Sequence, residues 1–324
     1  MAKNKPLVSV VFVNFNGKKL LRRAIASIKT SAYKNYGIVV VDNASTDGSQ
    51  QTVKREFPKT TLIQNKENLG YTGINNALPH CKGKYILFLN NDLEMEKQAI
   101  TELVNILEKN SNAAIAVPKL INYYNRKIDS AGTWVSRAFY NGHYQVDEAD
   151  DNIKEIPYMG VGLIRKTVVE KFGHLFDPDY FIYAEDLDLG LRIRMLGMKT
   201  LYVPQAVCYH MHSMTMKSVP DSKKTFLMER NLLTTFYKIP SFTTLIMLFP
   251  YVYFMRLLTI LRDIFTFRFT IATARIKAVC AVFLQLAPIM RKRKTLQHMR
   301  TADDAYVFSI FTEKYLLSGK KLTI

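Results

Sequence analysis

Runs of buried-type residues alternate with segments of helical periodicity through the first part of the chain, and this alternation constrains the fold most. Leu7–Val13 is almost wholly apolar and β-branched, as expected for a strand covered on both faces. Apolar residues then recur at helical spacing at Leu21, Ala24, Ile25 and Ile28. Strands that alternate with helices of this length predict an α/β fold with a mostly parallel sheet flanked by helices. Ligands of such sheets bind beyond the carboxyl ends of the strands.

The alternation continues to about residue 107. We expect further strands at Ile38–Val41, Thr61–Gln64 and Lys84–Leu89, and helices through Val53 and Phe57, around Ile74–Leu78 and over Ile100–Leu107. The chain has 324 residues, 48% of them hydrophobic, so it can bury a sizeable core and disorder is not expected. Its three cysteines lack paired spacing, which argues against a disulfide scaffold and fits a reducing compartment. We recognise no secretory signal in the first residues.

Basic charge is concentrated in the last third of the chain. Residues 217–324 carry 18 of the 45 Lys and Arg residues but only 6 of the 27 Asp and Glu residues. This region contains the apolar run 239–261, whose one charge is Arg256, and a second apolar run, Ala278–Met290, that leads into an Arg-Lys-Arg-Lys sequence. We therefore predict two regions, an α/β domain at 1–216 and a basic, apolar helical region at 217–324.

Two polar clusters follow predicted strands and are candidate ligand contacts. Asp42 comes directly after the strand Ile38–Val41, where a carboxylate can accept hydrogen bonds from a base or a ribose; a helix cap is the alternative. The stretch 67–76 holds Gly70 and Gly73 among several asparagines, so its backbone can approach a ligand closely. A simple turn before a helix would have a similar composition.

Two further clusters are rich in carboxylates. Asp92 follows the strand Lys84–Leu89, a position that suits a hard divalent cation or an ordinary surface residue. Glu185, Asp186 and Asp188 lie within four residues and repel one another, although acids at a helix N-terminus gain from the helix dipole. Partial burial would raise the pKa of such a carboxyl group and make it a usable general base.

Two histidines occur close together later in the chain, at positions 210 and 212. We expect His210 and His212 to point to opposite sides of an extended segment, so that they do not chelate one metal together. One of them is a candidate metal ligand, and a packed or solvent-facing histidine is the alternative.

Taken together, these segments resemble the family 2 glycosyltransferases, which are inverting, nucleotide-sugar-dependent enzymes with the GT-A fold. The resemblance is carried, in order and at similar spacing over about residues 6–216, by VSVVFVNFNG, VVVDNASTDGS, NKENLGYTGINNAL, GKYILFLNNDLEM, MGVGLIRK, FGHLFDPDYFIYAEDLDLGLRIRMLGMK and YVPQAVCYHMHS. It is greatest to the rhamnosyltransferase-like, non-processive branch, which FLMERNLLTTFY also resembles. The QxxRW segment of processive synthases is absent, so we expect transfer of one or a few sugars.

The resemblance implies roles for individual residues. It implies a site for the nucleotide sugar formed by Val13, Asn14, Asn16, Asp42, Asn68, Gly70, Asn75, Asn91 and Arg192, in which Asp42 holds the base and Arg192 has a supporting role. It implies that Asp92 binds Mg or Mn on the diphosphate and that His210 completes this metal site. Glu185 and Asp186 would form the acid pair, with Asp186 as the general base that accepts the proton of the acceptor hydroxyl.

One position departs from the family pattern. The metal motif often reads Asp-x-Asp, whereas here it reads Asn90-Asn91-Asp92. A single strong ligand remains, so the motif does not imply tight metal binding. A catalytically inactive, membrane-bound scaffold or sensor of nucleotide sugars is therefore the alternative to an active enzyme. A nucleotidyltransferase is disfavoured, because the loop that begins at Asn14 lacks a Gly-rich phosphate-binding sequence with Lys or Arg.

The C-terminal region predicts contact with an anionic membrane surface. The run 239–261 has roughly the length that spans a bilayer, but Pro250 and Arg256 interrupt it. Basic residues then follow among apolar ones at Arg262, Arg268, Arg275 and Lys277. This pattern fits interfacial helices with basic side chains at phosphate headgroups, while one span or hairpin and a helical extension of the core are alternatives. Long aliphatic runs separate the basic residues, so nucleic acid is not an expected partner.

The resemblance also implies the substrates and the location. The donor would be a UDP-, dTDP- or GDP-linked sugar, and the acceptor a polyprenyl-linked or other glycan at the cytoplasmic face of the cell membrane. Such enzymes serve cell-surface polysaccharide or glycan biosynthesis. The sequence names neither the sugar nor the acceptor, because segment 123–157 is where such enzymes diverge.

Overall fold

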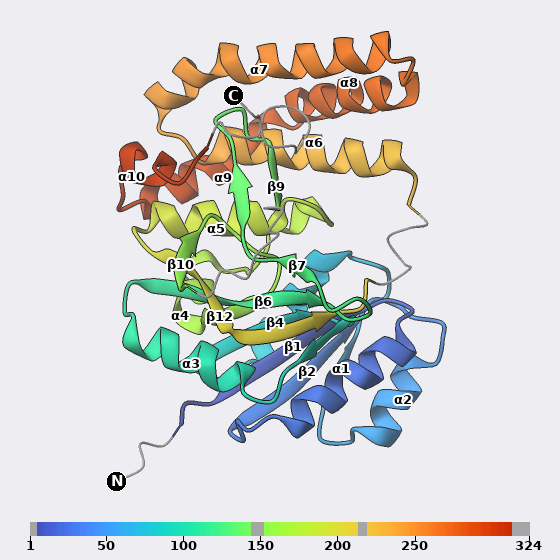
Figure 1. Cartoon of the computed structure of the whole chain (residues 1–324). Helices are drawn as coiled ribbons and strands as arrows, with labels where there is room; N and C mark the ends of the chain where they lie inside the picture. The colour runs from blue at the N-terminus through green and yellow to red at the C-terminus, as the bar shows by residue number, and fades with distance from the viewer. Residues whose placement is uncertain (1–4, 144–151, 213–218, 313–324) are drawn as a thin grey trace.

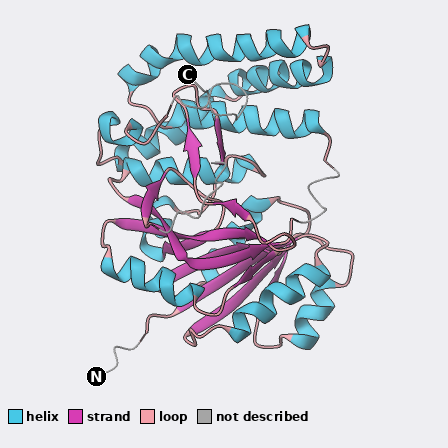
Figure 2. Ribbon diagram, viewed as in Figure 1, coloured by secondary structure: helices cyan, strands magenta, loops and turns pink. Residues whose placement is uncertain are grey.

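The centre of the molecule is one mixed sheet (Figures 1 and 2). The computed structural model describes residues 5–143, 152–212 and 219–312. The strands of the sheet lie in the order β10-β12-β6-β11-β4-β1-β2-β3, with β5 paired to β12 and β7 paired to β6. These strands are β1 (Val8–Asn14), β2 (Tyr36–Asp42), β3 (Thr61–Gln64), β4 (Tyr85–Asn90), β5 (Leu93–Met95), β6 (Ala113–Asn122), β7 (Ile128–Ser130), β10 (Lys154–Ile156), β11 (Gly162–Arg165) and β12 (Lys199–His210). A separate two-stranded ribbon pairs β8 (Thr133–Val135) with β9 (Asn141–His143).

Helices cover both faces of this sheet (Figure 1). They are α1 (Lys18–Thr30), α2 (Ser49–Glu56), α3 (Ala99–Lys109), α4 (Lys166–Phe172) and α5 (Glu185–Met195), together with the 3-10 helices η1 (Tyr71–His80) and η2 (Pro178–Tyr180). In the view of Figure 1, α1, α2 and α3 lie along the lower side of the sheet and α5 along its upper side. The predicted α/β architecture with flanking helices is therefore confirmed.

The predicted parallel strands are present, but the sheet is more mixed than expected. β1 pairs in parallel with both β2 and β4, and β2 with β3, because β-branched residues fill strands that are buried on both faces. β11 runs antiparallel between β4 and β6 and was not predicted. The helix predicted around Ile74–Leu78 is a 3-10 helix that contains Pro79, a residue that cannot donate a backbone hydrogen bond.

Five helices of the C-terminal region stack beyond α5. They are α6 (Asp221–Lys238), α7 (Phe242–Phe265), α8 (Phe269–Leu284), α9 (Leu286–Met299) and α10 (Asp304–Phe308). Figure 1 shows α6 and α9 next to α5, with α7 and α8 outermost. Leu232, Leu233 and Phe236 of α6 are fully buried in the same hydrophobic core as the sheet. The predicted boundary at 216 lies outside the described residues.

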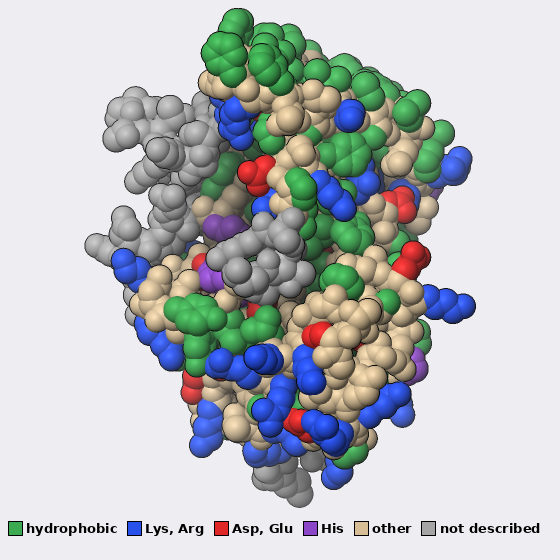
Figure 3. All heavy atoms as spheres, turned by 90° about the vertical axis from the view of Figure 1, so that its right-hand side faces the viewer, with side chains coloured by type: hydrophobic (Ala, Val, Ile, Leu, Met, Phe, Trp, Pro, Cys, Tyr) green, Lys and Arg blue, Asp and Glu red, His purple; other side chains and the backbone are tan. Residues whose placement is uncertain are grey.

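An apolar surface covers the outside of the α7–α8 pair, and we call it the outer apolar face. Its exposed side chains include Phe242, Ile246, Met247, Phe254, Leu257, Phe265, Ile276, Phe283 and Leu284. Figure 3 shows hydrophobic side chains gathered at this end of the molecule. Within the described part of the chain, α7 is the one helix long and apolar enough to cross a membrane, with a mean hydropathy of 1.8. The pair α8 and α9 would qualify only together and is bent by 66°.

Two of the arginines in this region turn inward. Arg256 is buried, pairs with Glu229 and donates to the carbonyl oxygen of Ala138. Arg275, which we expected at lipid headgroups, instead pairs with Glu229 and Asp263. The reason is that Glu229 and Asp263 are themselves buried and need cations beside them. Arg262 and Arg268 remain exposed in part.

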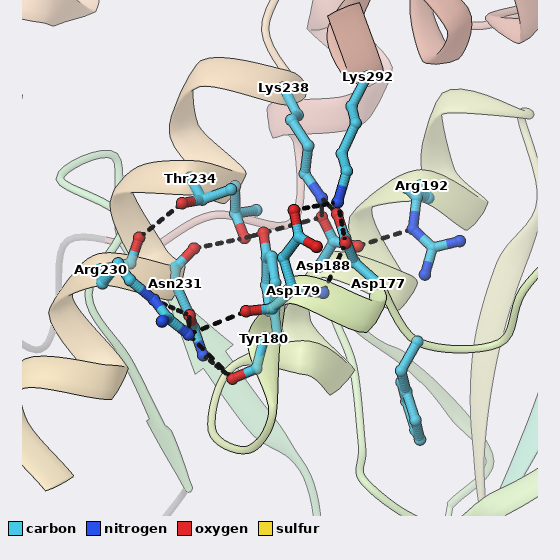
Figure 4. A network of polar contacts seen from close by, with 12 residues as sticks. Asp177, Asp179, Tyr180, Asp188, Arg192, Arg230, Asn231, Thr234, Lys238 and Lys292 are labelled. Atoms are coloured by element: carbon cyan, nitrogen blue, oxygen red, sulfur yellow. Dashed lines mark hydrogen bonds and ion pairs between the residues drawn. The ribbon is translucent and has the colours of Figure 1, made fainter. Parts of the chain in front are cut away.

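A buried lysine joins the C-terminal helices to α5 and to the loop before η2 (Figure 4). Lys238, the last residue of α6, lies with its Nζ 2.6 Å from Asp188 Oδ1 of α5 and 2.7 Å from Asp177 Oδ2. Lys238 and Asp188 have side chains that are 1% and 0% exposed. Lys292 of α9 also pairs with Asp177. Although burial opposes the charged form, these two lysines hold the pKa of Asp177 far below its usual range.

We predict that Lys238→Met destabilises the protein strongly. The substitution keeps an aliphatic chain but leaves two buried carboxylates without their shared cation, which typically costs about 3–5 kcal/mol. Urea unfolding would measure the loss. Lys224→Met on the same helix is the control, because its partner Asp221 is exposed and such a pair contributes about 1 kcal/mol or less. Equal effects of the two substitutions would contradict the importance assigned to Lys238.

Candidate active site

Three of the predicted nucleotide-site residues meet at the carboxyl ends of β1, β2 and β4. Register places Asn14 opposite Asp42, and Val13 opposite Asn90. The Nδ2 of Asn14 donates to Asp42 Oδ2 at 2.9 Å, and its Oδ1 accepts from Asn91 Nδ2 at 2.8 Å. Asn14 is fully buried, so this network is part of the wall beneath the strand ends.

The neighbouring loops close around Asp42. Its Oδ1 accepts from the backbone N of Ser45 at 2.9 Å and from Gln50 Nε2 at 2.7 Å. Asn16 is exposed in a left-handed conformation, with a φ of 50°, and its Oδ1 accepts from the backbone N of Thr46. Asp42 therefore organises the loop after β2, at the place where the nucleotide site is predicted. It does not cap α2, whose N-cap is Gly48 and receives no side-chain cap hydrogen bond.

The motif at 67–76 forms the next part of the wall. Asn68 Oδ1 accepts from the backbone N of Gly70 at 2.9 Å, and Gly70 has a φ of 65°. The amide of Asn75 binds the backbone of Leu175 and Phe176. Asn75 thereby ties this motif to the loop that precedes η2.

A cavity of about 310 Å³ adjoins this motif. It is lined by Glu67, Asn68, Leu69, Thr72, Asn75, Asn76, Pro178 and Phe181. It contains two of the predicted nucleotide-site residues but none of the carboxylates of the predicted metal and acid sites.

Asp92 and His210 are brought together by an antiparallel pairing. β12 pairs with β5 so that His210 lies opposite Leu93, and the backbone N of Met211 donates to the carbonyl oxygen of Asp92. The Nε2 of His210 is 3.4 Å from Asp92 Oδ2. The two predicted metal ligands are therefore neighbours, although they are far apart in sequence.

Asp129 and His212 complete this cluster. Asp129 Oδ2 is 2.6 Å from Nδ1 of His210, and its Oδ1 is 2.9 Å from Nε2 of His212. The ligand atoms of these three residues lie within 4.8 Å of one another. Burial lowers the pKa of His210, but hydrogen bonds to Asp129 and Asp92 outweigh it and raise the pKa to about 9. A cation bound by this imidazole would displace that proton.

The prediction that His210 and His212 point to opposite sides is wrong. Their rings lie side by side, with centroids 4.1 Å apart, and both contact Asp129. Side chains alternate along an extended chain, so residues two apart share a face. His212 itself has a φ of 49°, which ends the strand at this point.

Glu185 and Asp186 begin helix α5 and occupy apolar surroundings. Burial, with a smaller contribution from the charge of Asp186, raises the pKa of Glu185 well above its usual range. Asp186 is half-buried, and desolvation raises its pKa to about 6. The backbone N of Leu187 donates to Asp186 Oδ1. A carboxyl group with this pKa is mostly ionised at neutral pH and still basic enough to accept a proton.

Tyr71 links the two acid sites. Its hydroxyl donates to the carbonyl oxygen of Gly160 at 2.7 Å, and a Cβ on Gly160 would lie 3.3 Å from Asp186 Oδ2. Burial raises the pKa of the Tyr71 hydroxyl, and the charges of Glu185, Asp186 and Asp92 raise it further. The Tyr71 hydroxyl is therefore buried next to Gly160, the residue beside Asp186, and within electrostatic range of Glu185 and Asp92.

Arg192, a residue of α5, lies inside the protein. It is fully buried, its Nε donates to Asp188 Oδ2 at 2.8 Å, and its Nη2 donates to the carbonyl oxygen of Leu175. These contacts hold α5 to the loop before η2, and the supporting role of Arg192 at the nucleotide site stays a prediction. Asp188 is likewise structural, because Lys238 and Arg192 lower its pKa despite its burial.

Asp129 and Tyr71 are two residues of the site that the sequence pattern does not mark. Tyr71 stands inside a motif that was recognised, but nothing in the sequence sets its hydroxyl apart. Asp129 lies in the divergent segment 123–157, and only the pairing of β7 with β6 carries it to the histidines. Both depend on tertiary contacts and had no local signal.

Comparison with known proteins identifies the family. Residues 9–172 match the sequence model of Glycosyl transferase family 2. The chain belongs to this family. The matched range contains the strand-end cluster and Asp92, whereas Glu185, Asp186 and His210 lie beyond it. Family membership establishes a glycosyltransferase that transfers a sugar from a nucleotide sugar.

Curated relatives agree with this assignment. The chain is 26% identical over 227 residues to an uncharacterized glycosyltransferase of Haemophilus influenzae, an alignment that covers 67% of this chain and 69% of that protein. It is 23% identical over 233 residues to the N-acetylglucosaminyl-diphospho-decaprenol L-rhamnosyltransferase of Mycobacterium tuberculosis, covering 63% of this chain and 76% of that protein.

Solved structures show the same GT-A fold. GalNAc-T7 with UDP, GalNAc and Mn²⁺ superposes with a TM-score of 0.59 at 17% identity, over 73% of this chain and 48% of that chain. The S. aureus TarS 1-349 complex with UDP gives a TM-score of 0.53 at 15% identity, over 72% of this chain and 66% of that chain. The chain thus spans about half of the first structure and two thirds of the second.

We predict that Gly70→Ala is much more damaging than an ordinary glycine substitution. Gly70 has a φ of 65° and a ψ of −155°, and a Cβ there would lie 2.2 Å from the carbonyl oxygen of Phe181. Strain and overpacking together should cost about 3 kcal/mol or more. Gly173→Ala is the control, because its φ is 75° but the space beside it is open, so that only about 1 kcal/mol is expected. Equal losses of unfolding free energy in the two variants would show that Phe181 moves away from residue 70 at little cost.

Proposed function

We propose that this chain transfers one sugar, with inversion, from a nucleotide-diphospho-sugar to a hydroxyl group of a polyprenyl-linked or other glycan acceptor. The observation that carries the proposal is Asp186, a half-buried carboxylate at the start of α5 whose pKa is raised to about 6 and which lies beside Gly160, the residue whose carbonyl oxygen accepts from the hydroxyl of Tyr71. A single displacement needs a base on one side of the sugar and charge neutralisation at the leaving diphosphate on the other. The two acid sites supply these two requirements.

The donor site is proposed at the strand ends. Val13, Asn14, Asn16, Asp42, Asn68, Gly70, Asn75 and Asn91 form its wall, with Asp42 toward the base and Arg192 as support from below. Gly70 lets the backbone approach the nucleotide closely, and exposed Asn16 offers amide groups to it. GalNAc-T7 and TarS, which share the fold, were solved with UDP. UDP-, dTDP- and GDP-linked sugars are therefore the donors to test.

The residues around Asp92 fit a divalent cation, Mg or Mn. Carboxylate oxygens and imidazole nitrogens converge there from Asp92, His210, Asp129 and His212. Asp92 and His210 would hold the ion, and Asp129 would orient the imidazole of His210 through Nδ1. When bound, the ion would neutralise charge on the leaving diphosphate. The motif has Asn90 in place of its first carboxylate, and Asp129 and His212 add a carboxylate and an imidazole next to His210.

The acid pair divides its roles by environment. Glu185 is buried and its pKa is raised well above its usual range, mainly by desolvation, whereas Asp186 is half-buried and its pKa is raised to about 6, so Asp186 is the acid of the pair that ionises more readily. Asp186 would accept the proton of the acceptor hydroxyl as that oxygen attacks the anomeric carbon. Gly160 leaves space beside Asp186, because a Cβ at this position would lie only 3.3 Å from Asp186 Oδ2.

We also propose that residues 217–324 anchor the catalytic region 1–216 to the cytoplasmic face of the cell membrane. The support is the outer apolar face of α7 and α8, with Arg262 and Arg268 exposed beside it. The rhamnosyltransferase of Mycobacterium tuberculosis is named for a decaprenol-linked acceptor. A chain on the membrane surface would meet such an acceptor directly, as in the rhamnosyltransferase-like branch.

The decisive experiment offers purified protein a panel of UDP-, dTDP- and GDP-sugars with Mn or Mg, with and without polyprenyl-phosphate-linked acceptors. Metal-dependent turnover of one donor supports the enzyme and names its sugar. Nucleotide binding without turnover on every acceptor favours the alternative, an inactive scaffold or sensor. Asn90→Asp would then be the first substitution to test for restored turnover.

We predict that Asp186→Asn lowers transfer by about 10²–10⁴-fold, because the amide cannot accept the proton. Binding of the donor nucleotide should stay nearly unchanged, since the substitution keeps the size of the side chain. Initial rates and nucleotide titrations measure the two quantities. Asp221→Asn, a substitution of an exposed acid on α6, is the control and should keep the wild-type rate.

In the wild type, kcat/KM should rise with pH through about 6 as Asp186 ionises. Normal turnover by Asp186→Asn would refute the assignment.

We predict that the triple substitution Met247→Ser, Phe254→Ser and Leu257→Ser weakens membrane binding at least about tenfold, because each apolar side chain gains roughly 1.5 kcal/mol or more on burial. These side chains are 71%, 56% and 51% exposed on α7. Co-sedimentation with phosphatidylglycerol vesicles measures binding. Substitution is preferred to truncation, because truncation would remove Lys238. Tyr124→Ser is the control, because Tyr124 is also well exposed, at 72%, but does not belong to α7 or α8. Undiminished pelleting of the triple variant would contradict the proposed surface.

A further inference from the structure

The segment that precedes the acid pair has an unusual backbone. Phe181, Tyr183 and Ala184 have φ values of 61°, 71° and 59°, although none is glycine. Left-handed backbone at non-glycine residues costs on the order of 1–3 kcal/mol each and persists only where surrounding contacts enforce it. This segment leads directly into Glu185 and Asp186, so its conformation sets where their side chains begin.

Asn231 of α6 supplies these contacts from one side (Figure 4). Its Nδ2 donates to the carbonyl oxygens of Tyr180 at 3.0 Å, Ile182 at 3.0 Å and Tyr183 at 2.6 Å. The side chain is almost fully buried, so water does not compete for these bonds. One amide group thus binds three carbonyl groups of the strained segment.

Arg230 fixes the orientation of this amide. Its Nε and Nη2 donate to Asn231 Oδ1 at 3.0 and 2.8 Å, which leaves the NH₂ group directed at the segment. Its Nη2 also donates to the carbonyl oxygens of Asp179 and Tyr180. The guanidinium group therefore supports Asn231 and adds two weaker contacts of its own.

The other side of the segment is held by η1. The carbonyl oxygen of Phe181 accepts from the backbone N of Tyr71 at 2.8 Å and of Thr72 at 3.3 Å. α6 is itself fixed to α5 by the buried pair of Lys238 and Asp188. The segment is therefore clamped between a helix that the buried ion pair immobilises and the motif proposed to bind the nucleotide.

We propose that Asn231 is a positioning residue for the transfer reaction, which holds the backbone at 180–183 so that Asp186 faces the acceptor hydroxyl. The inference rests on the proposed role of Asp186 as general base. Asn231 touches neither substrate, so its loss should misplace the base without removing the donor site. A misplacement on the order of 1 Å can cost about 10²-fold in rate.

The test compares Asn231→Ala, the isosteric Asn231→Asp and the control Thr234→Val in the full chain. Thr234 lies one turn along α6 and bonds only to the carbonyl oxygen of Arg230 within the helix. Both Asn231 variants should lower kcat by roughly 10–100-fold with the donor KM within about threefold, whereas Thr234→Val should match the wild type. Loss in Asn231→Asp assigns the effect to the donated hydrogen bonds, because the carboxylate keeps the shape but cannot donate.

Amide hydrogen exchange gives a readout independent of turnover. The amides of Tyr71 and Thr72 should exchange faster in Asn231→Ala than in Thr234→Val, because Phe181 is no longer held against them. Arg230→Ala is the milder variant if Asn231→Ala folds poorly, with an expected loss of about 3–10-fold in kcat. Unchanged exchange, or a normal kcat in folded Asn231 variants, overturns the inference. Normal turnover by Asp186→Asn would instead refute the proposed function, so the two failures are distinguishable.

Discussion

The buried cation of Lys238 is the interaction on which the arrangement of the site depends. Its ammonium group lies between Asp188 of α5 and Asp177 before η2, in a place almost closed to solvent. A buried cation there is stabilised by the two carboxylates that face it, and it in turn stabilises both of them together with Lys292 at Asp177 and Arg192 at Asp188. The end of α6 is thereby pinned to the first turn of α5, which carries Glu185 and Asp186. The C-terminal helices are part of the active-site scaffold as well as a surface for other contacts.

The first turn of α5 shows how environment separates residues of the same chemistry. Asp188 lies beside Lys238 and Arg192, and its pKa falls despite burial. Glu185 and Asp186 are also desolvated but have no cation beside them, so their pKa values rise. One carboxylate therefore stabilises the fold, while the other two, three residues or fewer away, have raised pKa values. The strained backbone that Asn231 holds leads directly into this turn.

The C-terminal region combines inward-facing charge with an outward-facing apolar surface. Arg256 and Arg275 neutralise the buried acids Glu229 and Asp263, so part of the basic excess serves the interior. The outer apolar face of α7 and α8 is left toward the surroundings (Figure 3). Helices that cover a domain in water usually turn their polar side outward, whereas here the charged side chains face inward and the apolar ones face outward. It gives the proposed membrane contact a physical basis that does not depend on net charge.

The sequence by itself determined the α/β fold, the family and the identity of the strand-end residues, because each depends on local patterns. Periodicity marks the strands β1, β2 and β4, and parallel strands bring Asn14, Asp42 and Asn91 to one edge. Tertiary structure alone decided which other residues join them. Asp129 reaches His210 and His212 through the pairing of β7 with β6, Asn231 reaches the segment before α5, and Lys238 reaches α5 itself, each of the last two from more than 40 residues away in the chain. The pKa values of Glu185 and Asp186 likewise depend on burial, which arises only when the distant elements pack together.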